Sequence, residues 1–222
     1  MAIIRLDGPG KVNTVSNEMR DAAEALWNDE VANRSDVKAA VFISSKPDNF
    51  IAGADINMLR EYKEAGREDE LKGICMTGHD MFDKLSASGL PLVAAINGSC
   101  LGGGLEWAMK CDYRVASTSK KTKLGLPEVK LGLLPGWGGT QNLPKLVGLM
   151  EALPLILAGA AFGFATARSL PPPPTPLRPP CPKYTGRTNS AQLGGGSSFV
   201  GLCCDDVLVL RTRHTHTRTQ HC

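Results

Sequence analysis

Two glutamates in this sequence have the surroundings that acid–base catalysis requires. Glu106 is flanked by Leu105 and Trp107, and Glu128 follows Pro127 among further apolar neighbours. A glutamate among apolar side chains needs a partner or a function, because burial of an unpaired charge is costly. If the two carboxylates share one pocket, their proton affinities separate, and one can act as an acid while the other acts as a base. The spacing alone leaves a second interpretation open, in which both are surface glutamates at helix starts, favoured there by the helix dipole.

Three consecutive glycines, Gly102, Gly103 and Gly104, stand just before Glu106. Glycines after a strand let the backbone approach a ligand closely, and amides at the start of a helix point toward an anion or a polarised carbonyl oxygen. The enolate oxygen of a thioester is one such target. A tight turn and a dinucleotide-binding loop are the alternatives. The run does not satisfy the G-x-G-x-x-G pattern, so the dinucleotide interpretation is weak.

These residues need a scaffold of strands and helices, and apolar runs alternate along the chain with segments of helical spacing. Glycine-rich segments follow the strands, which indicates an α/β domain with parallel pairing. In such folds ligands bind at the carboxyl ends of the strands. We expect strands at 2–6, 38–45, 91–97 and 112–117, a loop at 46–50, and helices at 17–32, from about 55, at 68–87, through 105–109, at 139–147 and at 150–158.

The composition is typical of a soluble globular protein, with 42% hydrophobic and 21% charged residues among 222. This length allows one large domain or two small ones. The longest strongly apolar stretch, 153–165, contains a proline and two glycines and is too short to span a bilayer. Because Met1 leads directly into a predicted strand, we expect no signal or transit peptide. We expect Cys75, Cys100 and Cys111 to be buried, reduced thiols, since the seven cysteines show no paired spacing.

The sequence changes character after Gly159. Eight of the twelve residues in 171–182 are prolines, and a glycine- and serine-rich run follows at 194–198. We interpret 160–222 as a low-complexity tail that is either disordered or aberrant, meaning translated non-coding sequence. Seven of the 25 Lys and Arg residues but only two of the 22 Asp and Glu residues lie in this tail. The basic excess therefore lies outside the body of the chain, which argues against nucleic-acid binding.

The end of the tail carries histidines and a cysteine that could suggest a metal site. Their spacing matches no standard zinc pattern, and the proline-rich surroundings offer no scaffold, so we expect no metal site. The alternating His-Thr pattern is also what a repeated CA dinucleotide encodes, which supports the hypothesis of translated non-coding sequence. The residues concerned are His214, His216, His221 and Cys222.

Four short blocks stand in a specific order along the chain: IAGADI at 51–56, NGSCLGGGLE at 97–106, GLPEV at 125–129 and LPGWGGTQ at 134–141. Together they resemble the crotonase family of enoyl-CoA hydratases and isomerases, and the resemblance covers about residues 1–159. It implies an α/β fold of the crotonase-like (ClpP/crotonase) type, a spiral of ββα repeats that is incomplete at its C-terminal side. We therefore divide the chain into a partial enoyl-CoA hydratase domain, 1–159, and the tail, 160–222.

The resemblance implies that Glu106 and Glu128 are the catalytic residues of a lyase. They would hold one water, which Glu106 helps to activate for attack at C3 of a trans-2-enoyl-CoA, while Glu128 supplies the proton at C2. It also implies an oxyanion hole made by the backbone amides of Ala54 and Gly103. The expected product is a 3-hydroxyacyl-CoA in fatty-acid β-oxidation, formed without a metal or redox cofactor. The same blocks imply substrate contacts at Ala52, Gly53, Asp55, Gly102, Gly104, Pro127 and Gly136.

Two alternatives stay open at this point. One is an enoyl-CoA isomerase of the same family, although members that only isomerise commonly lack one of the two acids. The other is a non-catalytic truncated fragment, which would keep both glutamates and lack the helices that complete the fold. Two positions depart from the common family pattern. Trp137 stands where many members carry a small residue, and Asn142 replaces a common arginine, and we expect neither to touch the chemistry.

Within the family, the segments 44–47, 55–59 and 98–100 look most like the α subunit of the mitochondrial trifunctional protein of fatty-acid β-oxidation. This resemblance implies an acyl-CoA thioester substrate. It further implies a homotrimer or a trifunctional α/β complex, and a mitochondrial location.

Overall fold

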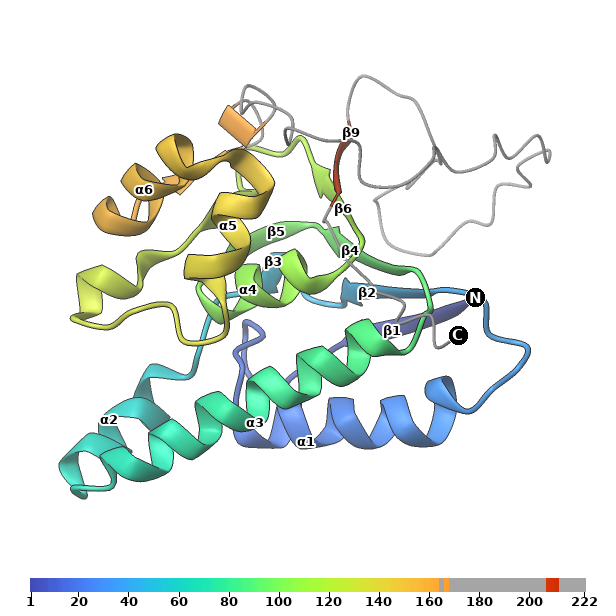
Figure 1. Cartoon of the computed structure of the whole chain (residues 1–222), viewed down its shortest axis with the longest axis horizontal. Coiled ribbons are helices and arrows are strands. Elements are labelled where there is room, and N and C mark those ends of the chain that lie inside the picture. Colours follow the sequence, from blue (N-terminus) through green and yellow to red (C-terminus); the bar gives the residue numbers. More distant parts are fainter. Residues whose placement is uncertain (164–165, 168–206, 212–222) are drawn as a thin grey trace, which may run out of the picture.

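The computed structural model describes residues 1–163, 166–167 and 207–211. The predicted tail therefore lies largely outside the described residues, including the histidines near its end. In the described part, two sheets form the centre and helices pack around them (Figure 1). The α/β class expected from the sequence is confirmed.

The first sheet contains the strands that the apolar runs predicted. Its first four strands are parallel, and side chains along the second strand alternate between buried and partly buried positions, as in a sheet with unequal faces. A fifth, antiparallel strand from the tail region pairs with the last of them. The order is β1 (Ala2–Leu6), β2 (Ala40–Ser44), β4 (Leu92–Ile96), β6 (Tyr113–Ser117) and β9 (Val207–Arg211).

The second sheet was not predicted from the residues. Three of its strands follow directly after strands of the first sheet, so that β2 leads into β3, β4 into β5 and β6 into β7. An α-helix follows β3 and another follows β5, and a short 3₁₀ helix that carries Glu128 follows β7. This order produces the ββα repeat that the family resemblance implies. The order is β3 (Asp48–Ile51), β5 (Gly98–Leu101), β7 (Lys123–Gly125) and β8 (Ala161–Phe162), with β8 antiparallel to β7.

Two of the helices begin at a side chain that caps their first amides. The Ser16 side chain accepts a hydrogen bond from the Met19 amide, and the Asp55 carboxylate accepts from the amides of Asn57 and Met58. The predicted helix 17–32 is α-helical at first and then forms a π-helical turn, η1. The bounds are α1 (Asn17–Leu26), η1 (Trp27–Ala32), α2 (Ile56–Glu64), α3 (Glu68–Ala87), α4 (Gly103–Lys110), the 3₁₀ helix η2 (Pro127–Leu131), α5 (Gly139–Val147) and α6 (Leu149–Ala158).

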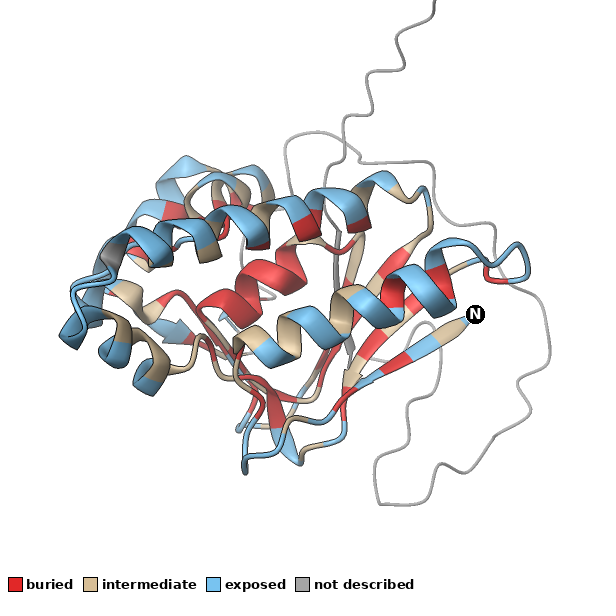
Figure 2. Ribbon diagram, turned by 90° about the horizontal axis from the view of Figure 1, so that it is seen from below, coloured by how far each residue is buried: buried red, intermediate tan, exposed pale blue. Residues whose placement is uncertain are grey.

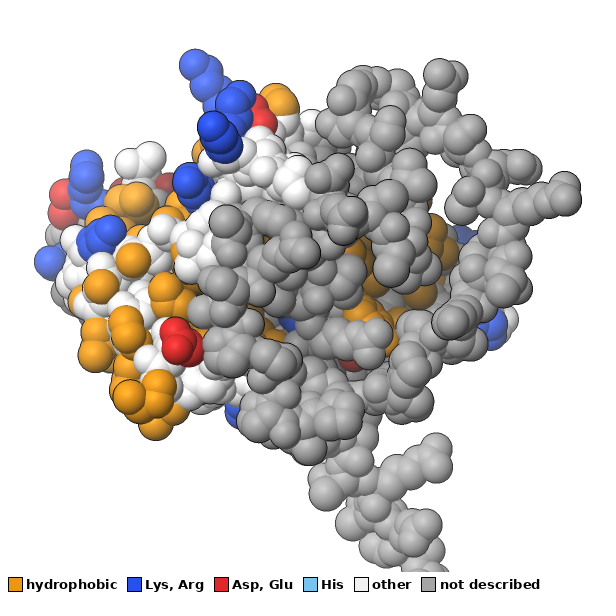
Figure 3. Space-filling view, turned by 90° about the horizontal axis from the view of Figure 1, so that it is seen from above, with side chains coloured by type: hydrophobic (Ala, Val, Ile, Leu, Met, Phe, Trp, Pro, Cys, Tyr) orange, Lys and Arg blue, Asp and Glu red, His pale blue; other side chains and the backbone are white. Residues whose placement is uncertain are grey.

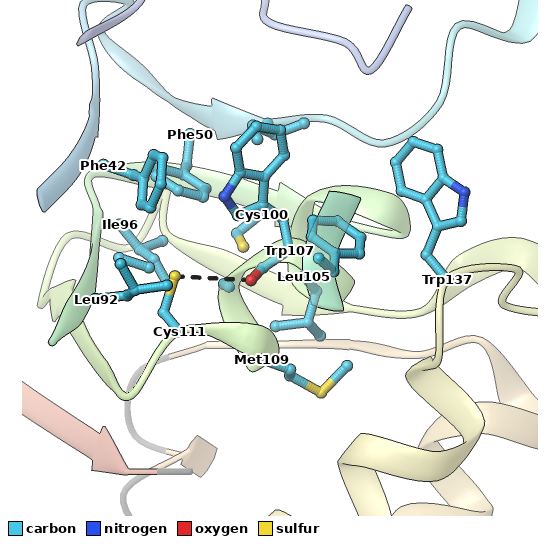
Figure 4. Packing of buried hydrophobic residues seen from close by; sticks show 14 of the residues in the cluster. Phe42, Phe50, Leu92, Ile96, Cys100, Leu105, Trp107, Met109, Cys111 and Trp137 are labelled. Carbon is cyan, nitrogen blue, oxygen red and sulfur yellow. Dashed lines mark hydrogen bonds between the residues drawn. The ribbon is translucent and has the colours of Figure 1, made fainter. Parts of the chain in front are cut away.

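Helix α4 is the centre of the packing. Residues 103–109 are all buried, whereas α1 and α3 expose their outer faces to solvent (Figure 2). Trp107 meets Phe42 of β2 and Phe82 of α3 edge to face, at ring-centroid distances of 5.5 and 5.7 Å. Phe82 in turn meets Trp137, which lies apart from the other labelled rings (Figure 4). These aromatic contacts fix the helix that carries Glu106 between the first sheet and α3.

Helix α6 has an exposed apolar face. Figure 3 shows hydrophobic side chains gathered on the side of the molecule where α6 lies, and Leu149, Met150, Leu153 and Leu157 are each at least 40% exposed. The helix is nevertheless short, and no described helix is long and apolar enough to cross a membrane.

Of the thiols in the described residues, Cys100 and Cys111 are buried and unbridged as predicted, and Cys75 is half-buried.

The packing of α4 on β3 predicts the effect of one methyl group. A Cβ on Gly104 would overlap the Ile51 carbonyl and lie 2.6 Å from its Cβ, so we expect Gly104→Ala to lower the free energy of unfolding by about 1–3 kcal/mol. Gly73 of α3 has open space around its Cβ position, and Gly73→Ala should raise stability by up to about 1 kcal/mol through helix propensity. Urea unfolding of both variants tests this. Equal stability of the two variants would contradict the close packing of α4 on β3.

Candidate active site

A cavity of about 250 Å³ brings the two sequence-predicted glutamates together. It opens at the ends of the second-sheet strands, between the start of α1, α2, α3 and the loop before α5. The site residues predicted from the sequence that line it are Ala52, Gly53, Ala54, Gly102, Gly103, Glu106, Pro127, Glu128 and Gly136.

Two residues that we expected to contact substrate do not line the cavity. The Asp55 carboxylate caps α2, where it accepts hydrogen bonds from two amides of that helix. Gly104 faces the backbone of Ile51 and serves the packing of α4 on β3. Both stand next to cavity residues in the sequence, but the structure gives each of them another role. Their assignment as substrate contacts stays a prediction.

Glu106 is the more deeply buried of the two carboxylates, with 2% of its surface exposed. Its Oε1 atom accepts hydrogen bonds from the backbone amides of Trp137, at 2.8 Å, and Gly139, at 2.7 Å. Gly139 can approach this closely because it has no side chain, since a Cβ there would lie 2.9 Å from Oε1. The alternative of a surface glutamate is therefore wrong for Glu106.

Burial raises the pKa of Glu106 to about 7. The two amide donors act in the opposite direction, and the negative charge of Glu128 adds to the rise. A carboxyl group with this pKa exchanges its proton near neutral pH, which is the property that general acid–base catalysis requires.

Glu128 faces the same cavity from η2. It is partly buried, and its Oε2 atom has no hydrogen-bond partner among the described residues although it is shielded from solvent. Burial raises the pKa of this carboxyl group as well. A Cβ on Gly102 would lie 2.9 Å from the Oε1 atom of Glu128, so the glycine run leaves room for this side chain. An unpaired carboxylate oxygen beside a cavity is available to a substrate or a water.

Two backbone amides at the cavity wall donate no hydrogen bond to any described residue. The isolated bridge between Val15 and Ala54 uses the carbonyl of Gly53 and the amide of Asp55, which leaves the Ala54 amide out of the pairing. Gly103 is the first residue of α4, so its amide has no partner within the helix. Such amides at a cavity wall can stabilise a developing negative charge on an oxygen.

Asn13 holds this wall in place, and sequence reasoning missed it. The side chain is fully buried, and its Nδ2 lies within hydrogen-bonding distance of the Leu6 carbonyl, the Ser44 hydroxyl and the Phe50 carbonyl. The Asn13 carbonyl accepts a hydrogen bond from the Ala52 amide. The residue thus ties the ends of three strands to the Ala52–Ala54 segment.

The cavity also contains residues that the sequence did not single out as site residues. Arg20 of α1 and Cys75 of α3 line it, and so does Trp137. Burial and the charge of Glu106 raise the pKa of the Cys75 thiol, which disfavours the thiolate. Trp137, which we expected to lie apart from the chemistry, lines the cavity, and its backbone amide donates a hydrogen bond to Glu106. The described residues contain no group of three or more His, Cys, Asp or Glu that could hold a metal ion.

Known proteins are similar to this chain in sequence. The chain is 49% identical over 160 residues to the fatty acid oxidation complex subunit alpha of Idiomarina loihiensis, and 46% identical over 171 residues to that of Vibrio campbellii. These matches cover 72% and 77% of the chain, which spans only about a quarter of the length of these relatives (22% and 24%). Both relatives are bacterial, and bacteria have no mitochondria, so the mitochondrial location expected from the resemblance is overturned.

Solved structures agree with the fold. An enoyl-CoA hydratase from Geobacillus kaustophilus superimposes with a TM-score of 0.67 at 34% identity, covering 74% of this chain and 60% of its own. One from Thermoplasma volcanium gives a TM-score of 0.67 at 30% identity, covering 76% and 64%. The enoyl-CoA hydratase/isomerase family model matches residues 1–170. With the crotonase fold, the paired glutamates and this match over most of its length, the chain belongs to the enoyl-CoA hydratase/isomerase family.

Proposed function

We propose that this chain hydrates trans-2-enoyl-CoA thioesters to 3-hydroxyacyl-CoA thioesters as a step of fatty-acid β-oxidation. The observation that carries the proposal is the placement of Glu106 and Glu128 on one cavity, with burial raising the pKa of each carboxyl group. Hydration of a double bond needs an acid and a base on the same water and substrate, and two such carboxyls supply both.

In the proposed reaction, the thioester oxygen accepts hydrogen bonds from the amides of Ala54 and Gly103. These amides withdraw electrons from the double bond and stabilise the enolate as it forms. The water held by the two glutamates forms a bond from its oxygen to C3, and Glu106 assists by polarising it. Glu128 delivers a proton to C2. The proton that the water loses returns to the glutamate pair, so the pair ends the cycle in its starting protonation state.

The second candidate is isomerisation of a 3-enoyl-CoA to a 2-enoyl-CoA, which the same family includes. Isomerisation moves one proton between two carbons and needs only one acid–base group. The presence of two glutamates on the cavity favours hydration. Product analysis separates the two, because hydration adds the mass of water and isomerisation leaves the mass unchanged.

The alternative from another class of function is a non-catalytic fragment. A fragment would not form the homotrimer or α/β complex that the family resemblance implies for the enzyme. Size-exclusion chromatography of the purified chain measures its oligomeric state. A trimer supports the enzyme proposal, and a monomer without hydratase activity supports the fragment.

Substitution of either glutamate should remove hydratase activity. We expect Glu106→Gln and Glu128→Gln each to lower kcat for a short 2-enoyl-CoA by roughly 10²–10⁴-fold, because each removes one proton-transfer group. The measurement is the loss of absorbance of the conjugated thioester. Glu151→Gln changes an exposed glutamate of α6 in the same way and should leave the rate unchanged. A fully active Glu106→Gln or Glu128→Gln variant would refute the assigned roles.

The raised pKa of Glu106 predicts how stability depends on pH. The carboxyl group has a pKa of about 7 in the folded chain and an ordinary value of 4.5, so the folded state holds the proton more tightly. Stability should therefore fall as the pH rises from about 4.5 to about 7 and stay low above it. Glu106→Gln keeps the acceptor oxygen and removes the charge, so it should stabilise the fold at pH 8 by up to about 3 kcal/mol and have little effect near pH 4.

Urea unfolding at both pH values tests this expectation, with Glu151→Gln as the control for loss of an exposed charge. An equal effect of Glu106→Gln at both pH values would show that the carboxylate is not destabilising in the folded chain.

A further inference from the structure

The Trp137 side chain lines the cavity that the two glutamates share and is only 7% exposed. Its six-membered ring lies against the start of α4, where a Cβ on Gly103 would come within 3.1 Å of two ring carbons. Its edge meets the ring of Phe82 at a centroid distance of 5.7 Å and an interplanar angle of 77°. The ring is therefore held in position and cannot swing away freely from the cavity.

Gly78 of α3 makes this ring position possible. A Cβ on Gly78 would overlap the indole Nε1 and lie 2.6 Å from Cε2. The glycine is buried in the middle of a 20-residue helix, where it costs about 1 kcal/mol relative to alanine. The space left by its missing side chain is filled by the indole.

The walls of the cavity differ in polarity. Arg20, which also forms an ion pair with Asp21, supplies the one cationic side chain of the lining, with Ser16 and Asn17 beside it at the start of α1. The wall that α3 contributes consists of Leu71, Ile74 and Cys75, and Trp137 lines the cavity as well. The nucleotide of CoA carries several negative charges and the acyl chain carries none. The charged part of the thioester therefore suits the α1 wall, and the acyl chain suits the apolar wall of α3 and Trp137.

With the thioester oxygen on the amides of Ala54 and Gly103, the reacting carbons lie beside Glu106, and the acyl chain continues toward the indole. The distance along this path is short, because the indole lies directly against Gly103, whose amide is one of the two proposed donors to the thioester oxygen. The whole cavity, at about 250 Å³, is smaller than the roughly 300–1,000 Å³ common for sites that bind drug-sized ligands.

We propose that Trp137 closes the acyl end of the cavity and restricts the chain to short acyl-CoA thioesters, and that Gly78 is the residue that admits the indole. The proposal rests on the proposed function for the orientation of the thioester. It assigns Trp137 a role in substrate specificity and none in proton transfer.

The test compares binding of two saturated thioesters, butyryl-CoA and decanoyl-CoA, by titration calorimetry. Saturated thioesters are not hydrated, so this readout does not depend on turnover. We expect the chain to bind butyryl-CoA and to bind decanoyl-CoA at least about 10-fold more weakly. Trp137→Ala should shift the ratio of the two affinities toward decanoyl-CoA by at least about 10-fold, and Trp137→Phe by less.

Trp27→Phe is the matched control, because Trp27 is also a buried tryptophan, at 4% exposure, but lies outside the lining of this cavity. It should leave the affinity ratio unchanged. A folded Trp137→Phe variant keeps the test valid if Trp137→Ala fails to fold. Circular dichroism of each variant establishes folding.

The outcomes distinguish a failure of this proposal from a failure of the proposed hydratase function. If the affinity ratio changes in the Trp137 variants but the chain does not hydrate 2-enoyl-CoA, the role of Trp137 is supported and the hydratase function is contradicted. Hydration of 2-enoyl-CoA with a chain-length profile that neither Trp137 variant alters supports the hydratase and overturns the role of Trp137. Equal binding of both thioesters by the unaltered chain, or binding of neither, also overturns it.

Discussion

The structure depends on keeping one carboxylate, that of Glu106, in a nearly dry position on a helix that is buried on all sides. A buried carboxylate is tolerated only if hydrogen bonds compensate for the lost water. Here the compensation comes from the backbone amides of Trp137 and Gly139, so the loop before α5 must pass directly over α4. The compensation is partial, which leaves the pKa of Glu106 near 7. The same incomplete compensation that we expect to destabilise the fold at high pH is what the proposed acid–base role of Glu106 requires.

The second constraint is the placement of two backbone amides at the wall of the cavity. The amides of Ala54 and Gly103 lie where the chain leaves β3 and β5, two neighbouring parallel strands. Parallel strands end at the same edge of a sheet, so two amides from distant parts of the sequence reach one cavity. The Asn13 network fixes one of these strand ends from behind. The site is thus built on the scaffold itself, and its side chains come from helices that the sheet ends hold in place.

Much of this arrangement follows from the sequence, and the parts that do not have identifiable reasons. The four parallel strands of the first sheet and all six α-helices were predicted, because long apolar runs and helical spacing are strong local signals. The fifth strand, β9, falls in the segment interpreted as a low-complexity tail and was not predicted. The strands at 98–101 and 123–125 were missed since they are short and glycine-rich, and only their pairing partners make them strands. The structural role of Asn13 was not predicted, because its hydrogen bonds reach residues as distant in the sequence as Phe50, and no local sequence pattern indicates such bonds.

Within the site, the sequence blocks identified which segments meet but not which way each residue faces. Asp55 and Gly104 illustrate this limitation, because both stand beside cavity residues in the sequence and neither lines the cavity. Trp137 and Gly78 add a further consequence. Because the indole fills the volume of the missing Gly78 side chain, any side chain at 78 would force the indole at 137 to move. The effect of a substitution at either position therefore depends on the residue at the other, so the two positions are epistatic.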